Sequence, residues 1–203
     1  ERWIKQTGGR GQYAVLTIRF EPAALGGGIE FVSALRGPAV KREYVPSIEE
    51  GFREAARSGG PLGFPFVNIR ATLIDGKDHP VDSSDLAFFH AAFEAFQKAR
   101  ERTENVILEP LARFEVTAPL EYLGETIGSL NARRSRIESV EGADHLRTIR
   151  GIIPIAETFG YTTVIRSLTQ GRGTAVLEPA GFVPAPASVE EELLERRPAA
   201  AGG

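Results

Sequence analysis

The amino-acid sequence predicts a mixed α+β protein of two domains. Its 203 residues exceed the usual length of one domain, which is about 100 to 150 residues. Strand-like alternation and helix-like apolar spacing follow one another along the chain. The polar segment "RERTEN" at 100–105 interrupts this apolar pattern. We therefore expect a domain boundary near residue 105.

Two strands open the first half of the chain. Residues 13–20, "YAVLTIRF", combine β-branched residues with alternation of apolar and polar positions, and "IEFVSAL" at 29–35 repeats the pattern. The loop "EPAALGGG" joins them. We expect the two strands to form an antiparallel pair.

A short helix and a third strand follow. Ser47 is placed as an N-cap, Glu50 completes a capping box, and Gly59 is a stop signal, which predicts a helix over this stretch. The pattern "FVNIRATLI" at 66–74 predicts a strand. Turn-forming residues at 75–82 predict an exposed loop after it.

The strongest helix signal in the sequence begins at Ser84. A stripe of large apolar residues recurs there at helical spacing, and we expect it to face the core. The stripe consists of Leu86, Phe89, Phe93 and Phe96. Asp82 or Ser83 is expected to cap this helix.

The second half reads as β-α-β-β-α-β. The predicted elements are a strand at 106–117, a helix at 121–134, strands at 136–141 and 146–153, a helix at 156–168 and a strand at 174–179. This order is typical of the ferredoxin-like fold. A last short helix at 188–196 is expected to begin with Ser188 as its cap, and the tail at 197–203 is expected to be disordered.

The composition limits the class of protein. The chain has no cysteine, which excludes a disulfide framework, a thiolate metal site and a cysteine nucleophile. No apolar run approaches the roughly 18 residues of a membrane span, so no membrane partner and a cytoplasmic location are expected. A net charge of −3 is not typical of a nonspecific nucleic-acid binder. Because the chain begins at Glu1 and lacks methionine, we interpret it as a fragment of a longer protein.

Two polar stretches invite a chemical interpretation. The glycine-rich "KQTGGRGQY" at 5–13 lacks the Lys-[Ser/Thr] of a phosphate-binding loop and precedes a strand, so a nucleotide site is not predicted. The loop "DGKDHPVDSSD" could suggest a calcium site, but the sixth position from Asp75 is Pro80 and the twelfth is Leu86. A solvated turn, a hydrolase that uses His79 and a small-molecule regulatory module on the ferredoxin-like half remain as alternatives.

Five ordered motifs resemble bacterial translation elongation factor G over about residues 1–195. They are "KQTGGRGQY" at 5–13, "EYVPSIEEG" at 43–51, "DHPVDSSDLAF" at 78–88, "ILEPL" at 107–111 and "FGYTTVIRSLTQGRG" at 159–173. The resemblance implies the fourth and fifth domains of that family. The first, 1–105 plus 188–196, would be an α/β module with a left-handed βαβ crossover (ribosomal protein S5 domain 2-like). The second, 106–184, would be ferredoxin-like.

The resemblance also implies which residues contact RNA. In the family, a glycine loop and a histidine loop form the tip that reaches the decoding site of the small ribosomal subunit. Here that tip would comprise Gln6, Thr7, Gly8, Gly9, Arg10, Gly11, Lys77, Asp78, His79 and Pro80. Contacts of the second domain with the GTPase-associated rRNA of the large subunit would use Arg133, Arg134, Arg166 and Arg172.

The function implied is promotion of tRNA–mRNA translocation by a monomeric, ribosome-bound factor. This segment would be neither an enzyme nor a cofactor-binding or metal-binding protein, whereas the parent protein would be a GTPase that uses GTP and Mg. Departures such as Lys77 and Asp78 at the tip, where many relatives have Ser-Tyr, are typical of a divergent paralogue. Such a paralogue would act in ribosome recycling or in ribosomal protection.

Overall fold

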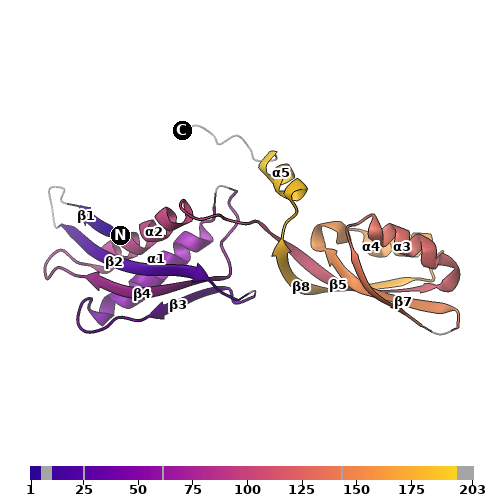
Figure 1. Cartoon of the computed structure of the whole chain (residues 1–203), viewed down its shortest axis with the longest axis horizontal. Helices are drawn as coiled ribbons and strands as arrows, with labels where there is room; N and C mark the ends of the chain where they lie inside the picture. Colours follow the sequence, from indigo (N-terminus) through magenta and orange to yellow (C-terminus); the bar gives the residue numbers. More distant parts are fainter. Residues whose placement is uncertain (6–10, 25, 61, 143, 196–203) are drawn as a thin grey trace. The chain divides into compact units, whose positions relative to one another are not determined.

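The computed structural model describes residues 1–5, 11–24, 26–60, 62–142 and 144–195, which form two compact units (Figure 1). The first unit comprises Glu1–Asn105 together with residues from Glu191 onward, and the second comprises Val106–Glu190. Each unit contains its own sheet and its own core. The chain is therefore a mixed α+β protein with two sheet-containing domains, as predicted. The tail predicted at 197–203 lies outside the described residues.

The sheet of the first unit has the strand order β1-β2-β4-β3. Its strands are β1 (Arg2–Lys5), β2 (Gln12–Pro22), β4 (Ile69–Lys77) and β3 (Ile29–Ser33). β1 and β4 both run antiparallel to β2, whereas β3 runs parallel to β4. The short strand β1 was not predicted, because four residues show too little alternation to be recognised.

The predicted antiparallel pairing of the first two long strands is wrong, because β4 lies between β2 and β3. The loop after β2 is bound to the chain that enters β4: Ala23 N–H donates to the Asn68 carbonyl (2.7 Å), and Ile69 N–H donates to the Gly28 carbonyl (3.1 Å). Alternation of side chains tells which face of a strand is buried, but not which strand is its neighbour. The hand of the β3–α1–β4 crossover stays a prediction.

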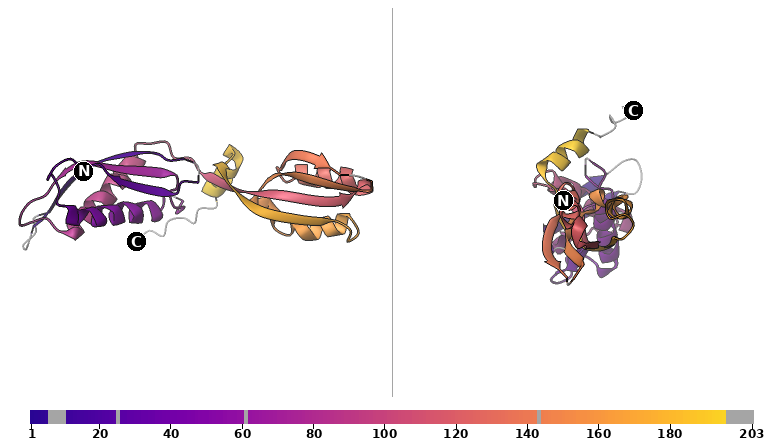
Figure 2. Two further views of the ribbon diagram at one scale, coloured as in Figure 1. Left: turned by 90° about the horizontal axis from the view of Figure 1, so that it is seen from below. Right: turned by 90° about the vertical axis from the view of Figure 1, so that its right-hand side faces the viewer.

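Two helices cover one face of this sheet (Figure 2). They are α1 (Val45–Arg57) and α2 (Asp85–Arg100). Both helices begin at the same end of the unit. The Ser47 hydroxyl in the first turn of α1 donates a hydrogen bond to Asp85 Oδ1 at the start of α2 (2.8 Å). Ser47 is therefore not the predicted N-cap: α1 begins two residues earlier, with Pro46 in its first turn, where a missing N–H costs nothing. Gly59 does follow the end of α1, with φ +78°.

The start and the buried face of α2 also differ from the prediction. Ser84 caps the helix by accepting a hydrogen bond from Ala87 N–H (3.2 Å), so neither Asp82 nor Ser83 does so. The buried positions are Ala87, Phe88, Ala91, Ala92 and Phe96, whereas Leu86 is 55% exposed. Of the predicted stripe, Phe96 is buried and Phe93 packs against the core cluster that contains it, whereas Phe89 is only partly buried and its main chain lies close to Gly51 of α1.

The second unit has the predicted ferredoxin-like order. Its elements are β5 (Leu108–Pro119), α3 (Leu123–Asn131), β6 (Arg136–Glu141), β7 (Leu146–Pro154), α4 (Tyr161–Leu168) and β8 (Thr174–Pro184). The sheet order is β6-β7-β5-β8, with all neighbours antiparallel. Leu130 of α3 and Ile165 of α4 pack on Phe114 and Ile149 of the sheet.

Three helix starts in this part of the chain differ from the sequence prediction. α3 begins at Leu123 rather than at 121, after a 3-10 turn at Leu120–Tyr122. α4 begins at Tyr161 rather than at 156, because Gly160 takes a left-handed conformation with φ +70° after a 3-10 turn at Ile155–Thr158. The last helix, α5 (Ala187–Glu195), contains Ser188 inside it rather than at its cap.

Replacement of Gly51 by alanine should destabilise the first unit by about 2 to 3 kcal/mol, a cost typical of overpacking. A Cβ at this position of α1 would lie 2.2 Å from the carbonyl oxygen of Phe89 in α2. Trp3 is the single tryptophan of the chain, so its fluorescence during urea unfolding reports on this unit.

The matched control is Gly128→Ala in α3, where an added Cβ would meet no atom within 4 Å. This change should stabilise the second unit by about 0.5 to 1 kcal/mol, because alanine loses less backbone entropy than glycine in a helix. Circular dichroism during urea unfolding measures this change in the free energy of unfolding. Effects of the same sign for the two variants would contradict the close contact of α1 with α2.

Candidate functional site

One end of the first unit collects the segments that the sequence analysis predicted to form a tip. Lys5 at the end of β1 pairs with Gln12 at the start of β2, so residues 6–11 connect two strands of a hairpin. Of the predicted glycine loop, Gln6, Thr7, Gly8, Gly9 and Arg10 lie outside the described residues, and Gly11 is described. We call residues 11–13 and 77–83 together the hairpin end.

The histidine loop starts beside the hairpin because β4 pairs with β2. Lys77, the last residue of β4, lies opposite Val15. The loop predicted at 75–82 is therefore shorter than expected: Asp75, Gly76 and Lys77 belong to the strand. Gly76 faces inward, where a Cβ would lie 2.6 Å from Val40 Cγ2. Lys77, His79 and Pro80 are exposed, and Asp78 is partly exposed.

A buried hydroxyl joins the histidine loop to β2. Ser83 Oγ accepts a hydrogen bond from the His79 N–H (2.8 Å) and donates one to the Tyr13 carbonyl (2.6 Å). The Tyr13 N–H donates in turn to the Asp82 carbonyl (2.9 Å). Ser83 is only 7% exposed, so these bonds are shielded from competing water. We call this arrangement the Ser83 clip. The sequence analysis gave Ser83 only a capping role.

Asp82 lies between the two predicted tip segments. A Cβ on Gly11 would lie 2.9 Å from Asp82 Oδ1, so a larger residue at position 11 would displace the Asp82 side chain. The other carboxylate oxygen, Oδ2, lies 3.2 Å from Nδ1 of His79. The sequence analysis assigned Gly11 to RNA approach, and the structure shows a reason for this glycine within the protein itself.

The His79 ring is held on one side and exposed on the other. Its Nδ1 is engaged within the loop, because the N–H groups of Val81 (3.3 Å) and Asp82 (3.2 Å) and the Asp82 carboxylate (3.2 Å) all lie within reach of it. The Tyr13 ring lies 5.7 Å away, and the His79 side chain is 47% exposed. Nε2 is therefore the ring nitrogen left for an outside partner. The Ser83 hydroxyl bonds main-chain groups rather than this ring, which is not the geometry of a hydrolase.

A layer of aromatic and polar contacts supports the hairpin near its end. The Trp3 indole N–H donates to Gln12 Oε1 (2.8 Å), and its ring stacks on His90 at 5.0 Å. The Lys5 ammonium lies 4.1 Å from the Trp3 ring centroid. Because Lys5 and Gln12 flank the glycine loop, these contacts fix the two points from which the loop departs.

Three of the four arginines predicted to contact rRNA are engaged within the second unit. Arg134 makes a two-pronged pair with Glu109 (2.7 and 3.0 Å) and a further contact with Glu157 (3.2 Å). Hydrogen bonding to Glu109 raises the pKa of Arg134, although partial burial opposes this. Arg133 donates to the Glu157 carbonyl (2.8 Å) and lies over the Tyr161 ring, 4.9 Å from its centroid.

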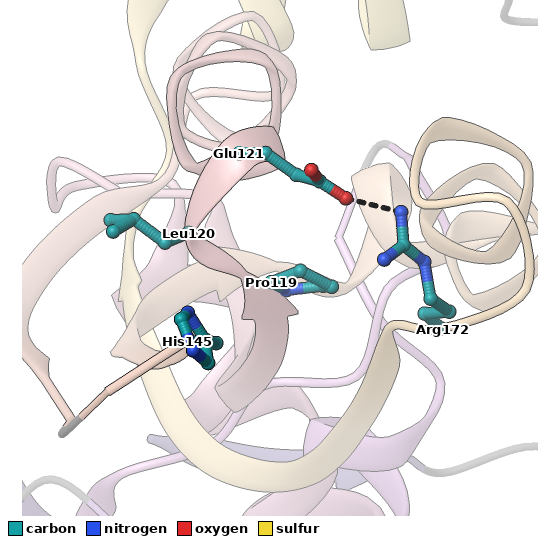
Figure 3. Close-up of a pocket in the computed structure, with 5 residues that line it drawn as sticks. All are labelled: Pro119, Leu120, Glu121, His145 and Arg172. Carbon is teal, nitrogen blue, oxygen red and sulfur yellow. Dashed lines mark hydrogen bonds and ion pairs between the residues drawn. The ribbon is translucent and has the colours of Figure 1, made fainter.

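Arg172 lines a shallow pocket of the second unit with a volume of about 360 Å³ (Figure 3). The pocket is lined by Pro119, Leu120, Glu121, His145 and Arg172. Arg172 forms an ion pair with Glu121, which raises the pKa of its guanidinium, and donates to the Tyr122 hydroxyl (2.8 Å). Arg166, on α4, is exposed, and its side chain forms no ion pair with any described residue.

Neither a metal centre nor a membrane span is found in the described ranges. They contain no group of three or more histidine, aspartate or glutamate side chains that could hold a metal ion. None of their helices is both long enough and apolar enough to cross a bilayer.

Comparison with known proteins agrees with the two folds. Residues 1–104 match the family described as elongation factor G, domain IV, and residues 106–193 match the elongation factor G C-terminus. An elongation factor G from Fervidobacterium nodosum is 43% identical over 194 residues, which cover 96% of this chain and 28% of that relative. A crystal structure of a protein from Thermus thermophilus matches with a TM-score of 0.86 and 37% identity, over 96% of this chain and 29% of that one.

The two folds, in this order, define the carboxy-terminal pair of domains of a translational elongation factor. The chain belongs to the elongation factor G family and corresponds to its domain IV and its C-terminal domain. It spans less than a third of the length of the relatives it matches. No GTPase domain is among the matched regions.

Removal of the clip hydroxyl by Ser83→Ala should loosen the histidine loop and cost about 1 to 3 kcal/mol, because it leaves buried main-chain groups unpaired. Hydrogen exchange of the amides at 77–83 should accelerate. Trp3 fluorescence during urea unfolding gives the free energy. The control is Ser47→Ala, whose hydroxyl bond to Asp85 is exposed and should contribute within about 0.5 kcal/mol. Unchanged exchange at 77–83 would argue against the clip.

The substitution Arg134→Gln should destabilise the second unit by about 2 kcal/mol, since it leaves the buried Glu109 carboxylate without its cation. The value is below that of a fully buried pair because the Arg134 side chain is 35% exposed. Arg166→Gln should change stability by no more than about 0.5 kcal/mol. Thermal melting followed by circular dichroism compares them, and equal melting of the two variants would exclude the structural role of Arg134.

Proposed function

We propose that this chain is the ribosome-contacting carboxy-terminal part of an elongation factor G-like GTPase. In this proposal its hairpin end enters the decoding site of the small ribosomal subunit and promotes tRNA–mRNA translocation. The observation that carries the proposal is the Ser83 clip, which holds the histidine loop against the strand that leaves the glycine loop. Membership of the elongation factor G family supports it.

The exposed groups of the hairpin end suit contact with RNA. In this proposal Nε2 of the exposed His79 ring donates to RNA, because Nδ1 is already engaged by groups of the loop itself. Such a donor can bond a phosphate oxygen, a ribose hydroxyl or a base edge. Lys77 adds a positive charge at the end of β4. The glycines of the preceding loop remove side-chain bulk, which allows main-chain amides to approach RNA closely.

The clip gives these donors a fixed position. A loop that is ordered only on binding loses conformational entropy at that moment and binds more weakly for the same contacts. The buried bonds of Ser83 and the contact of Gly11 with Asp82 order the loop beforehand. In this proposal the ordered hairpin end occupies the site that the tRNA has left. It thereby prevents the tRNA from moving back, which is what translocation requires.

In this proposal, GTP and Mg are bound by another domain of the parent protein. The chain contains no Gly-rich loop followed by Lys-[Ser/Thr], and we assign it no step of GTP hydrolysis. Its part is mechanical: it converts a rearrangement driven elsewhere into displacement at the decoding site. We also propose that the protein is monomeric and cytoplasmic.

The second unit is proposed to contact the GTPase-associated rRNA of the large subunit. Arg166 is the best placed of the four candidates, because its exposed guanidinium has no ion-pair partner among the described residues. Arg172 can reach RNA only if it shares or leaves the carboxylate of Glu121. Contact of Arg133 or Arg134 with RNA would come at the expense of bonds that hold the unit together.

A role in ribosome recycling or ribosomal protection is the alternative outcome. Asp78 places a carboxylate at the hairpin end, where it repels RNA phosphates. Assays of the full-length protein on ribosomes distinguish these roles. A translocation factor supports repeated rounds of peptide synthesis, whereas a recycling factor supports only the separation of the ribosomal subunits.

Loss of the His79 donor in the full-length protein should slow the ribosomal step and leave GTP hydrolysis intact. For His79→Ala we expect about a tenfold lower single-round translocation rate, which corresponds to one lost hydrogen bond of about 1.4 kcal/mol. Ribosome-stimulated GTPase rates should stay within about twofold. His79→Gln, which keeps an N–H donor, should recover part of the rate.

Thermal melting is the folding control for both variants. Equal translocation rates for His79→Ala and the parent would contradict the proposed role of this loop. A parallel fall in translocation and GTPase rates would instead show failed ribosome binding or misfolding, and would also count against it.

A further inference from the structure

We propose that residues 34–44, the segment between β3 and α1, form a third RNA-contacting element at the hairpin end. Arg36, Lys41 and Arg42 would neutralise backbone phosphates of ribosomal RNA or of its bound tRNA and mRNA. The inference rests on the proposed function and extends it, because none of the residues assigned above to RNA contact lies in this segment.

The sheet topology brings this segment to the hairpin end. β3 and β4 are parallel neighbours, so their carboxyl ends lie at the same edge of the sheet. The Ala34 N–H donates to the Leu73 carbonyl of β4 (2.9 Å). Val40 lies against Gly76, the residue before Lys77. Figure 1 shows the connection from β3 to α1 at the same end of the unit as the connection from β4 to α2.

The segment is anchored to the core and does not hang freely in solvent. Val40 and Tyr44 are 2% and 9% exposed, and Leu35 packs against the same core cluster. The Tyr44 ring stacks on Phe88 of α2 at 4.6 Å. The cations on this segment are therefore presented from a fixed main chain, which lowers the entropy lost on binding.

The charged side chains of the segment point away from these anchors. Arg36, Lys41 and Arg42 are exposed, and the guanidinium groups of Arg36 and Arg42 form no ion pair with any described residue. Lys41 lies 3.6 Å from Glu43, but the two side chains are 55% and 63% exposed, so this pair contributes little. Elsewhere in the unit, Arg53 and Arg70 are paired with carboxylates at 2.7 Å.

The surroundings are compatible with an anionic partner. α1 begins directly after the segment and has no acidic side chain in its first turn, so the positive end of its dipole is not offset from within that turn. Asp85 lies at the start of α2, where it accepts the Ser47 hydroxyl bond. The opposing charges are Glu43 in the segment, Asp78 and Asp82 in the histidine loop, and Asp75 near the end of β4. Guanidinium groups favour phosphate because they bind two of its oxygens at once.

A cross-linking experiment identifies the partner. The chain has no cysteine, so Arg36→Cys introduces a single attachment point for a photoreactive group. The labelled full-length protein is irradiated on ribosomes carrying tRNA and mRNA. We expect cross-links to RNA. The control is Arg57→Cys at the far end of α1, which is 62% exposed and should give few or none. Cross-links from position 36 mainly to ribosomal protein would overturn the inference.

Salt dependence provides a second, independent measurement. Binding of the 203-residue chain to purified small ribosomal subunits is titrated at several salt concentrations. The double variant Arg36→Gln, Arg42→Gln should bind more weakly and should lower the slope of log affinity against log salt by about 1.4 to 1.8, the value for two lost phosphate contacts. The control variant Arg57→Gln, Arg102→Gln should leave the slope unchanged.

The outcomes separate this inference from the proposed function. If the parent chain binds and His79→Ala weakens it, but the Arg36, Arg42 variant keeps both affinity and slope, the inference is wrong and the proposed function stands. If the unsubstituted 203-residue chain does not bind the subunits and the labelled full-length protein gives no cross-link to RNA, the inference and the proposed function are both wrong. Unchanged melting of the double variant shows that a lower affinity reflects lost contacts.

Discussion

The parallel pairing of β3 with β4 determines where every candidate contact of the first unit lies. Because a parallel neighbour must be reached by a crossover, α1 connects the two strands and begins at the end where β3 finishes. β4 finishes at the same end, so α2 also begins there. Three connections, 6–11, 34–44 and 78–84, consequently leave one end of the sheet.

This arrangement has a packing cost that glycine and alanine absorb. Two helices that start together and lie on one face must approach each other closely, and Gly51 meets the main chain of Phe89 directly. Ala87, Ala91 and Ala92 of α2 are buried in the core of the same unit. The strands and helices behind the hairpin end form one packed body, which positions the Ser83 clip.

The sequence was sufficient for the class of fold and for most of the elements, although not for β1, because strong periodicity is a local signal. It placed the order of the ferredoxin-like unit and the helix at Ser84 correctly. The sequence was not sufficient for features that depend on contacts between residues tens of positions apart. These features are the neighbour of β3, the buried face of α2 and the role of Ser83. The family motifs named Gly11 and His79, but local patterns carry no sign that Asp82 lies between them.

Counting arginines in the sequence could not separate structural cations from those available to RNA. Arg134 lies next to Arg133 in a run that resembles a basic patch. Its guanidinium group is nevertheless paired with the buried carboxylate of Glu109. Arg36 and Arg42 stand apart in a segment rich in turn residues, and their guanidinium groups have no carboxylate partner among the described residues. A cation contributes to RNA affinity only to the extent that it is not already neutralised, since exchanging one carboxylate partner for a phosphate gains little. The pairing state of each cation, more than net charge, therefore indicates which surface of this chain can meet RNA.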